Sequence, residues 1–310
     1  MTNPLLVILG PTAAGKTRLA VNLAHEFNGE IISADSRQVF SGMDIGTGKD
    51  LEEYYVSGKK IPYHLIDIKA AGEKYNVDAF KEDFYTAFQQ INAQHQLPIL
   101  CGGTGMYIHS ILQQHELTAI PVNEGLRQKL MMLSKELLVE KLQTYPKKLW
   151  LHVDFSSAKR MIRAIEICEF LTYQTLPKNE RPNIDPLVIG LSISIEIRRK
   201  QILDRLALRL KNGLIEEVQG LLAKGIGQEM LTFYGLEYKF VGAYLNKELD
   251  FETLKERLGI AICQYAKRQL TFFRKMEKDG VKINWLAAEQ GMEELKQQAM
   301  ELISHKFDLK

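Results

Sequence analysis

The sequence predicts an α/β protein with a doubly wound, mainly parallel sheet into which a helical segment is inserted. Apolar runs of strand length alternate with amphipathic helical segments over residues 5–114. Two of these runs end in a glycine-rich turn that leads straight into a helix. Residues 118–182 break the alternation, because they are helical in pattern and contain no clear buried strand. We therefore expect a core made of residues 1–115 and 183–310, and a helical insertion domain made of residues 116–182.

The first glycine-rich turn has the sequence GPTAAGKT, which matches the G-x-x-x-x-G-K-[ST] spacing of a phosphate-binding P-loop. It follows an apolar run at residues 5–9 and precedes a helical pattern that reaches Phe27. Glycines let the backbone N–H groups point at an anion, and the helix adds the positive end of its dipole. Lys16 supplies a mobile charge for the phosphates, and the hydroxyl of Thr17 can bind Mg²⁺. We therefore expect a P-loop NTPase-like core in which a di- or triphosphate is bound by Gly10, Pro11, Thr12, Ala13, Ala14, Gly15, Lys16 and Thr17.

A second apolar run, residues 30–34, ends at Asp35 and continues into Ser36, Arg37 and Gln38. Ligands of open α/β sheets bind at the carboxyl ends of the strands, so we expect Asp35 to lie near the P-loop. From the local sequence, Asp35 can bind Mg²⁺, accept a proton from a substrate, or cap the next helix. These three alternatives remain open at this point.

The apolar run at residues 97–101 ends in a second glycine-rich turn, GGTG, at residues 102–105. A helix is expected to follow over residues 106–114, so Thr104 would lie on the same edge of the sheet as Asp35. Such a turn can be a second substrate-binding loop, or a tight turn that needs glycine for steric reasons.

One segment near the C-terminal end of the sequence combines two kinds of side chain. Residues 265–274, YAKRQLTFFR, interleave aromatic and basic side chains. This pattern suits RNA contact, but it also arises when Phe272 and Phe273 pack inward.

Hydrophobic periodicity predicts further elements. We expect strands over residues 63–67, 187–195 and 281–286, and helices over residues 78–93, 197–212, 214–222, 251–277 and 292–306.

Basic residues also gather in the expected insertion, where Lys159, Arg160 and Arg163 lie within KRMIRAIE. Lys159 and Arg163 share a helix face because they are four residues apart. The cluster can be an ordinary solvated face or a contact for an anionic partner. The net charge of the chain is only +2, so a nucleic-acid partner has to be argued from local patches of this kind.

The composition is that of an ordinary globular protein. The 310 residues are 45% hydrophobic and 25% charged, which is enough for a sizeable core. No apolar run approaches the roughly 20 residues of a membrane-spanning helix. Cys101, Cys168 and Cys263 are widely spaced and form no metal-binding pattern, so we expect a reduced, cytoplasmic setting.

Five segments together resemble the tRNA dimethylallyltransferases, also called tRNA isopentenyltransferases, and the likeness spans nearly the whole chain. They occur in the order seen in that family: GPTAAGKT, ISADSRQVF with MDIGTGK, PILCGGTGMY, KRMIRAIE and YAKRQLTFFR. The P-loop alone would be shared with many kinases, whereas its combination with ADSRQ and GGTGMY is much more specific. The chain resembles a bacterial member, because the zinc finger of eukaryotic members is absent.

The resemblance implies transfer of a dimethylallyl group from dimethylallyl diphosphate to N6 of adenosine 37, in tRNAs that read codons beginning with U. The products would be N6-(dimethylallyl)adenosine and diphosphate, so the P-loop would hold a leaving diphosphate rather than ATP. Lys16, Arg205 and Mg²⁺ on Thr17 would stabilise the departing charge. Asp35 would accept a proton from the adenine amine or orient it, and Thr104 would contact the same adenosine. The tRNA contacts of the family correspond to Asp35, Ser36, Arg37, Gln38, Thr104, Arg127, Lys159, Arg160, Met161, Ile162 and Arg163.

The chain departs from the family pattern at Ile262-Cys263, where Thr-Arg is usual, and at Gln201, where Arg is common. None of these departures removes Lys16, Asp35 or Arg205. A monomer is the family expectation. Two alternatives remain: a P-loop kinase for small molecules, and an isopentenyltransferase acting on free adenine nucleotide. The second would not need the extended basic surface of the insertion.

Overall fold

The computed structural model describes residues 3–151, 153–176 and 180–308. The chain divides into two compact units, one formed by Met1–Gln113 with Pro182–Lys310 and the other by Gln114–Arg181. The expected insertion includes residues 152 and 177–179, which lie outside the described residues.

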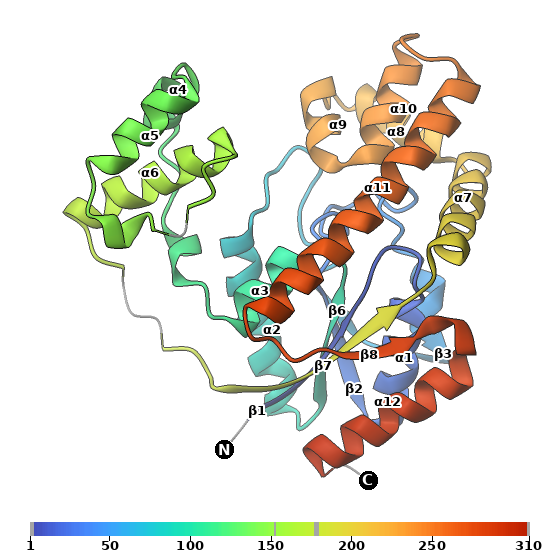
Figure 1. Cartoon of the computed structure of the whole chain (residues 1–310). Coiled ribbons are helices and arrows are strands. Elements are labelled where there is room, and N and C mark those ends of the chain that lie inside the picture. The colour runs from blue at the N-terminus through green and yellow to red at the C-terminus, as the bar shows by residue number, and fades with distance from the viewer. Residues whose placement is uncertain (1–2, 152, 177–179, 309–310) are drawn as a thin grey trace. The chain divides into compact units, whose positions relative to one another are not determined.

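The larger unit is built on a six-stranded sheet with the order β5-β2-β6-β1-β7-β8, in which every neighbouring pair is parallel (Figure 1). At the ends of the central strands, Leu9 is paired with both Gly102 and Gly190, so three carboxyl ends lie at one edge. This sheet confirms the expected α/β class. Its strands are β1 (Asn3–Leu9), β2 (Gly29–Ser33), β5 (Tyr63–His64), β6 (Leu97–Gly102), β7 (Ile184–Ser192) and β8 (Asn284–Ala287).

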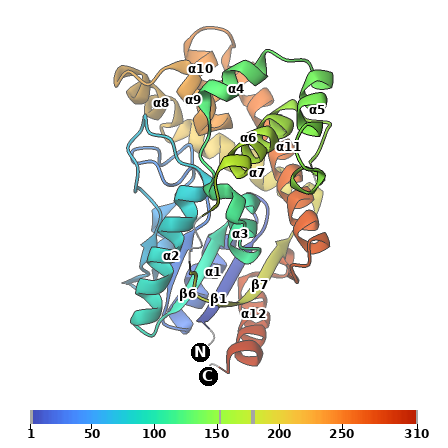
Figure 2. The ribbon, with the colours of Figure 1, turned by 90° about the vertical axis from the view of Figure 1, so that its left-hand side faces the viewer.

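Both faces of the sheet are covered by helices, which is why its central strands are continuous apolar runs. Leu5, Val7 and Leu9 pack on one side with α2, α3 and α11, whereas Leu6 and Ile8 pack on the other with α1 and α12 (Figure 2). These helices are α1 (Lys16–Glu26), α2 (Val77–Ala93), α3 (Gly105–Leu112), α11 (Phe251–Lys278) and α12 (Met292–Phe307).

The remaining helices of this unit are contributed by the segment between β7 and α11. They are α7 (Ile195–Lys211), α8 (Leu214–Ala223), α9 (Gln228–Tyr234) and α10 (Leu236–Leu245). The sequence patterns did not predict α9 and α10, which are separated only by Gly235 at φ 135°. Short elements complete the unit: η1 (Leu51–Tyr54), the hairpin strands β3 (Tyr55–Val56) and β4 (Lys59–Lys60), and η4 (Ala288–Gln290).

Most expected elements are present, and two strands are shorter than expected. The strand expected over residues 63–67 ends at His64, because Leu65 and Asp67 adopt φ 64° and 58°, which extended backbone does not allow. The last strand begins at Asn284 rather than at residue 281. The strand expected over residues 187–195 is β7, which covers Ile184–Ser192 and ends before Ser194, the N-cap of α7.

The smaller unit is helical, as its pattern suggested. Its core contains Leu130, Leu138, Leu142, Met161 and Ile165. Its elements are η2 (Glu116–Ala119), α4 (Glu124–Met131), α5 (Lys135–Gln143), η3 (Lys147–Leu149) and α6 (Ala158–Tyr173). In neither unit do the described residues form a helix that is both long and apolar enough to cross a membrane.

Candidate active site

The P-loop lies between β1 and α1, as its motif predicts. Gly15 precedes the first turn of α1, and Ala13 adopts φ 64°, a left-handed conformation that costs a residue with a Cβ some free energy. The loop therefore stores backbone strain at the turn that leads into α1. Lys16 reaches back over the loop, and its Nζ donates a hydrogen bond to the carbonyl oxygen of Pro11 at 2.8 Å.

The surroundings of Lys16 make its charge costly in the ligand-free protein. Burial lowers the pKa of Lys16, and the positive charge of Arg205 lowers it further, while Asp35 and Glu53 oppose the shift. An anion in the P-loop would supply the missing counter-charge. Cys101 lines the same pocket, and burial raises its pKa to about 12, so its thiol stays protonated at neutral pH.

Asp35 and Thr104 are brought together at the ends of β2 and β6. The N–H of Ser36 donates to Thr104 Oγ1 at 3.1 Å, and the N–H of Arg37 donates to Asp35 Oδ1 at 2.9 Å. Asp35 is half-buried and lines the same cavity as Lys16. Its carboxylate therefore caps the turn that follows β2 and also faces the ligand cavity, so the structural and chemical alternatives for Asp35 are compatible.

Gln269 on α11 joins the two glycine-rich turns. Its Oε1 accepts a hydrogen bond from the N–H of Thr12 at 2.9 Å, and its Nε2 donates to the carbonyl oxygen of Gly103 at 2.9 Å. A Cβ at Gly103 would lie 2.3 Å from Nε2, so the turn needs glycine there. Gln269 lies within YAKRQLTFFR, but the aromatic and basic pattern of that segment predicts no role for it. Nothing in its own neighbourhood along the chain indicates contacts with residues more than 160 positions away.

Two arginines of α7 converge on the loop that contains MDIGTGK. Arg205 Nη2 pairs with Asp50 and lies 3.4 Å from the carbonyl oxygen of Gly48. Arg209 is one helical turn further along α7, and its Nη2 is 3.9 Å from Asp50 Oδ2. A Cβ on Gly48 would lie 1.6 Å from Arg209 Nη2 and 2.6 Å from Arg205 Nη2. Glycine at this position therefore lets both guanidinium groups approach the backbone.

Hydrogen bonds and ion pairs hold the loop that contains MDIGTGK in place. Glu217 on α8 accepts hydrogen bonds from the N–H groups of Asp44, Ile45 and Gly46 at 2.7 to 2.9 Å, and Tyr238 donates to the same carboxylate at 2.7 Å. Lys49, whose side chain is fully buried, is paired with Asp44 and Asp67. Gln38 ties the loop to β2, because it accepts from Ser33 Oγ and donates to the carbonyl oxygen of Gly48.

One cavity of about 430 Å³ in the larger unit is lined by Lys16, Asp35, Arg205, Arg209 and Gln269. Thr104 does not line this cavity, but it accepts a hydrogen bond from Ser36, which does. The P-loop contributes Thr12, Ala13, Lys16 and Thr17 to the cavity, and α7 contributes Arg205 and Arg209. Helices α9 and α10 add a further wall that the sequence patterns did not predict. That wall includes Thr232, Tyr234, Gly235, Leu236, Glu237 and Lys239. Burial raises the pKa of Glu237, while the nearby charge of Arg209 opposes the rise.

The basic residues expected to contact tRNA differ in their surroundings within the helical unit. Arg127 forms a two-pronged ion pair with the buried carboxylate of Glu166, at 2.9 and 2.7 Å. Arg163 donates to the carbonyl oxygen of Ile120 at 2.6 Å and also lies 3.4 Å from Glu166. Both side chains therefore hold the unit together.

The other four expected tRNA contacts on α6 differ in their exposure to solvent. Met161 and Ile162 are buried in the core of the unit, so their side chains are not exposed for an RNA contact. Lys159 and Arg160 are exposed, and Arg160 pairs with Asp154.

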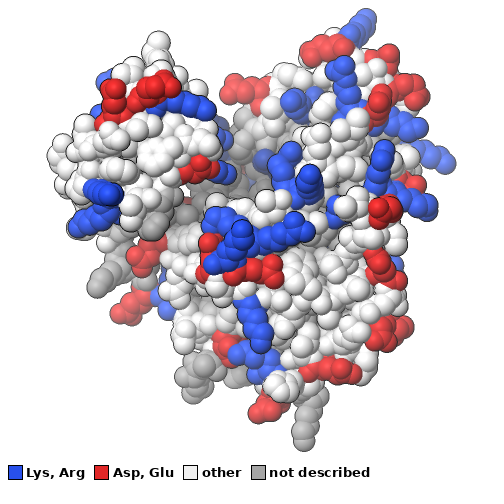
Figure 3. Space-filling view, in the orientation of Figure 1, with Lys and Arg blue, Asp and Glu red and all other residues white. Residues whose placement is uncertain are grey.

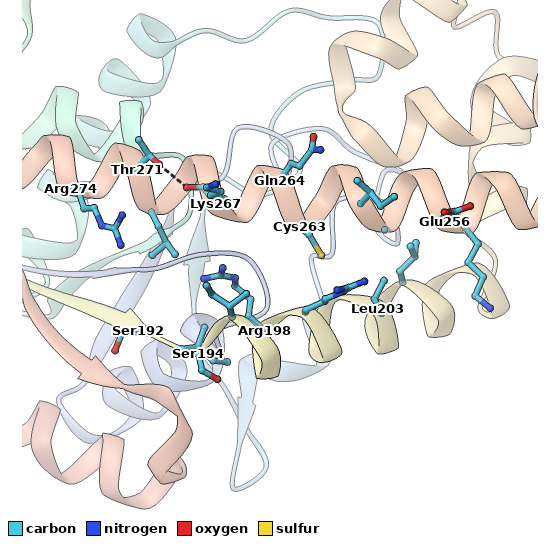
Figure 4. Close-up of a pocket in the computed structure, with 18 of the residues that line it drawn as sticks. Ser192, Ser194, Arg198, Leu203, Glu256, Cys263, Gln264, Lys267, Thr271 and Arg274 are labelled. Carbon is cyan, nitrogen blue, oxygen red and sulfur yellow. Dashed lines mark hydrogen bonds between the residues drawn. The ribbon is translucent and has the colours of Figure 1, made fainter.

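A larger groove of about 1160 Å³ lies between α7 and α11 (Figure 4). Apolar side chains such as Leu203 and Cys263 line it together with Arg198, Lys267 and Arg274. Lys and Arg side chains gather along this side of α11 (Figure 3). Among the described residues, the expected phosphate-binding residues and the tRNA contacts implied by the resemblance do not line this groove, whereas Lys267, Thr271 and Arg274 of the YAKRQLTFFR segment do.

Comparisons with known proteins agree with this geometry. A family model described as IPP transferase matches residues 38–276. The protein named tRNA dimethylallyltransferase 2 of Porphyromonas gingivalis is 51% identical over 284 residues, which are 92% of this chain and 94% of that protein. The protein of the same name from Phocaeicola vulgatus is 48% identical over 302 residues, which are 97% of this chain and 98% of that protein.

Solved structures show the same fold. The full-length tRNA isopentenylpyrophosphate transferase of Bacillus halodurans superposes with a TM-score of 0.70 at 30% identity, and the match covers 99% of each chain. A eukaryotic dimethylallyltransferase acting on tRNA has a TM-score of 0.79 at 22% identity, over 99% of this chain and 79% of that one, which is a likeness in fold. The resemblance seen in the five sequence segments is thereby confirmed, and the chain belongs to the IPP transferase family, that of the tRNA dimethylallyltransferases.

Proposed function

We propose that this chain transfers the dimethylallyl group of dimethylallyl diphosphate to N6 of adenosine 37 in tRNA, forming N6-(dimethylallyl)adenosine and diphosphate. The observation that carries the proposal is one cavity with a phosphate cradle on one side and the Asp35 carboxylate on the other. A kinase would also need the cradle. The kinase alternative leaves unexplained the second glycine turn that Gln269 ties to the P-loop.

The donor side of the cavity is built for a diphosphate. Lys16, Arg205 and the start of α1 present positive charge to the space above the P-loop. Preorganised cations stabilise the negative charge that develops as the C1–O bond of the donor breaks. Burial makes the positive charge of Lys16 unfavourable and lowers its pKa, and the negative charge of a bound diphosphate would offset this cost.

Mg²⁺ fits this donor side. The hydroxyl of Thr17 lines the cavity next to Lys16, and Mg²⁺ usually takes one or two protein ligands together with phosphate oxygens and water. The described residues contain no cluster of three or more His, Cys, Asp or Glu side chains that could hold a metal, so Thr17 is the protein ligand we assign. When bound, the ion would neutralise part of the diphosphate charge.

The acceptor side contains the groups that can activate an amine. A neutral exocyclic amine is a weak nucleophile, so removing its proton during attack speeds the reaction. In the proposed step the N6 lone pair forms a bond to C1, and the C1–O electron pair leaves with the diphosphate. The carboxylate of Asp35 accepts the proton that N6 loses. Thr104, hydrogen-bonded to Ser36, positions the adenosine beside that carboxylate.

The target base has to leave the anticodon-loop stack to enter such a cavity. We assign contacts with the flipped nucleotide to Asp35, Ser36, Arg37 and Thr104, because they lie at or next to the cavity. Of the tRNA contacts expected in the helical unit, Lys159 and Arg160 are the exposed ones, and we assign them to tRNA phosphates. Arg127 and Arg163 are assigned a supporting role, since they pair with Glu166. For Gln38, the bonds to Ser33 and Gly48 support a positioning role.

A transfer assay tests the proposal. Purified protein, Mg²⁺, labelled dimethylallyl diphosphate and unmodified tRNA that reads codons beginning with U are incubated, and the tRNA is digested to nucleosides. We expect labelled N6-(dimethylallyl)adenosine from the wild-type protein and none from Lys16→Ala. Label in free AMP instead would indicate an enzyme acting on free nucleotide. ATP turnover without any prenyl transfer would indicate a kinase.

A further inference from the structure

Arg209 is a largely buried cation in the candidate active site that the family motifs did not single out. Its side chain is 13% exposed and lines the same cavity as Lys16, Thr17 and Arg205. Its Nη2 atom is fully buried and has no hydrogen-bond partner among the described residues. A buried donor left without a partner costs free energy that a ligand can recover.

The carboxylates near Arg209 are too distant to satisfy it. Glu237 Oε1 is 3.8 Å from Nη1, and Asp50 Oδ2 is 3.9 Å from Nη2, whereas a hydrogen bond needs about 3.2 Å or less. Asp50 is instead engaged by Arg205. Arg209 therefore has counter-charges in its surroundings but no directed contact with either of them.

The two guanidinium groups are held close together although their charges repel. Both meet the backbone at Gly48, where a Cβ would collide with Arg209 Nη2 at 1.6 Å and Arg205 Nη2 at 2.6 Å. Burial and, to a smaller extent, the charge of Arg205 lower the pKa of Arg209. Such an arrangement of like charges is typical of a site prepared for a polyanion.

We propose that Arg209 is a second guanidinium group for the donor diphosphate, and that it forms with Arg205 a two-arginine clamp opposite the P-loop. This inference rests on the proposed function and names a residue of the same site. The four-residue spacing places both side chains on one face of α7, so one rigid helix presents both groups. Guanidinium groups suit this task because their donors match phosphate oxygens in pairs.

The competing explanation is that Arg209 only neutralises the buried Glu237. A cycle of variants separates the two: Arg209→Met, Glu237→Gln and the double variant, with Arg209→Lys as the conservative change. Arg199→Met is the matched control, because Arg199 is an exposed arginine on the same helix. The probe is inorganic diphosphate with Mg²⁺, whose binding is measured by calorimetry alongside the melting temperature of each variant.

Arg209→Met should weaken diphosphate binding by about 10- to 100-fold, the range expected for loss of a hydrogen bond to a charged group. Arg209→Lys should bind with intermediate affinity, and Arg199→Met should match the wild type. The double variant should bind diphosphate as weakly as Arg209→Met, even where removal of the Glu237 charge restores its melting temperature.

Two results would overturn the clamp: wild-type diphosphate affinity in Arg209→Met, or affinity restored in the double variant. If Arg209→Met does not fold, the comparison of the double variant with Glu237→Gln decides the same question. These outcomes are independent of the transfer assay. A wild-type protein that makes no prenylated adenosine refutes the proposed function, whereas unchanged diphosphate binding in active variants refutes only the role of Arg209.

Discussion

Replacing Gln269 by methionine keeps the length of the side chain but removes both of its hydrogen-bonding groups. The N–H of Thr12 and the carbonyl oxygen of Gly103 each lose a partner at 2.9 Å, in a place where Gln269 itself is 7% exposed. An unsatisfied buried polar group costs about 1–3 kcal/mol, so the two groups together should lower the free energy of unfolding by about 2–6 kcal/mol.

The same change should affect the reaction more than substrate binding. Both amide groups of Gln269 are engaged by the protein, and they set the distance between the P-loop and the turn that carries Thr104. A misplacement of about 1 Å between reacting groups can cost about 10²-fold in rate. We therefore expect the single-turnover rate of Gln269→Met to fall by about that factor, while KM for dimethylallyl diphosphate changes much less.

The assay combines urea denaturation with rapid-quench measurement of prenylated adenosine, at a temperature where the variant is folded. Gln264→Met is the matched control, because Gln264 is exposed on the same helix. A variant with lowered stability but an unchanged single-turnover rate would refute the positioning role. Wild-type stability would refute the reasoning about the unsatisfied groups.

Three further predictions concern charge. Burial lowers the pKa of Lys16, so its charge destabilises the ligand-free protein at neutral pH, and this cost disappears as the pH rises towards 10.5. Lys16→Met should therefore raise the melting temperature at pH 7 while abolishing transfer; a lower melting temperature would contradict the pKa shift. Asp35→Ala should reduce kcat by about 10²- to 10⁴-fold with tRNA affinity largely kept, as filter binding and kinetics would measure. Loss of tRNA binding with normal turnover of bound tRNA would contradict that role. Arg160→Ala should weaken tRNA binding and reduce its salt slope by about one unit, and an unchanged slope would return Arg160 to a solvated surface role.

The parts of the fold that depend on short stretches of sequence were predictable. The buried run in β1, the glycine spacing of the P-loop and the start of α1 are local features, and they indicate a phosphate site without any knowledge of distant contacts. The carboxyl-end rule also places Asp35 and Thr104 near that loop. The match to several family motifs then suggested the reaction.

The local sequence could not assign roles to side chains that act through distant partners. KRMIRAIE reads as a basic cluster, yet Met161 and Ile162 are buried and Arg163 is engaged with backbone carbonyls and Glu166. The helices α9 and α10 were not predicted, although they form one wall of the cavity, and Glu237 is part of that wall. Solvent exposure and ion pairing depend on which elements pack together, and a hydrophobic pattern along one helix does not specify its neighbours.

Local spacing thus identifies the α/β core and the phosphate cradle, because the strand, turn and helix that bind the phosphate are consecutive in the chain. The reaction class came from the resemblance of several segments to one family. The contacts of Gln269 and the convergence of Arg205 with Arg209 over Gly48 come from packing. They join residues that are more than 150 positions apart, and their distances are set by how α7 and α11 pack against the sheet and its loops. The physical reason is that the chemistry of a buried charge depends on the groups around it, and folding brings those groups from separate parts of the chain.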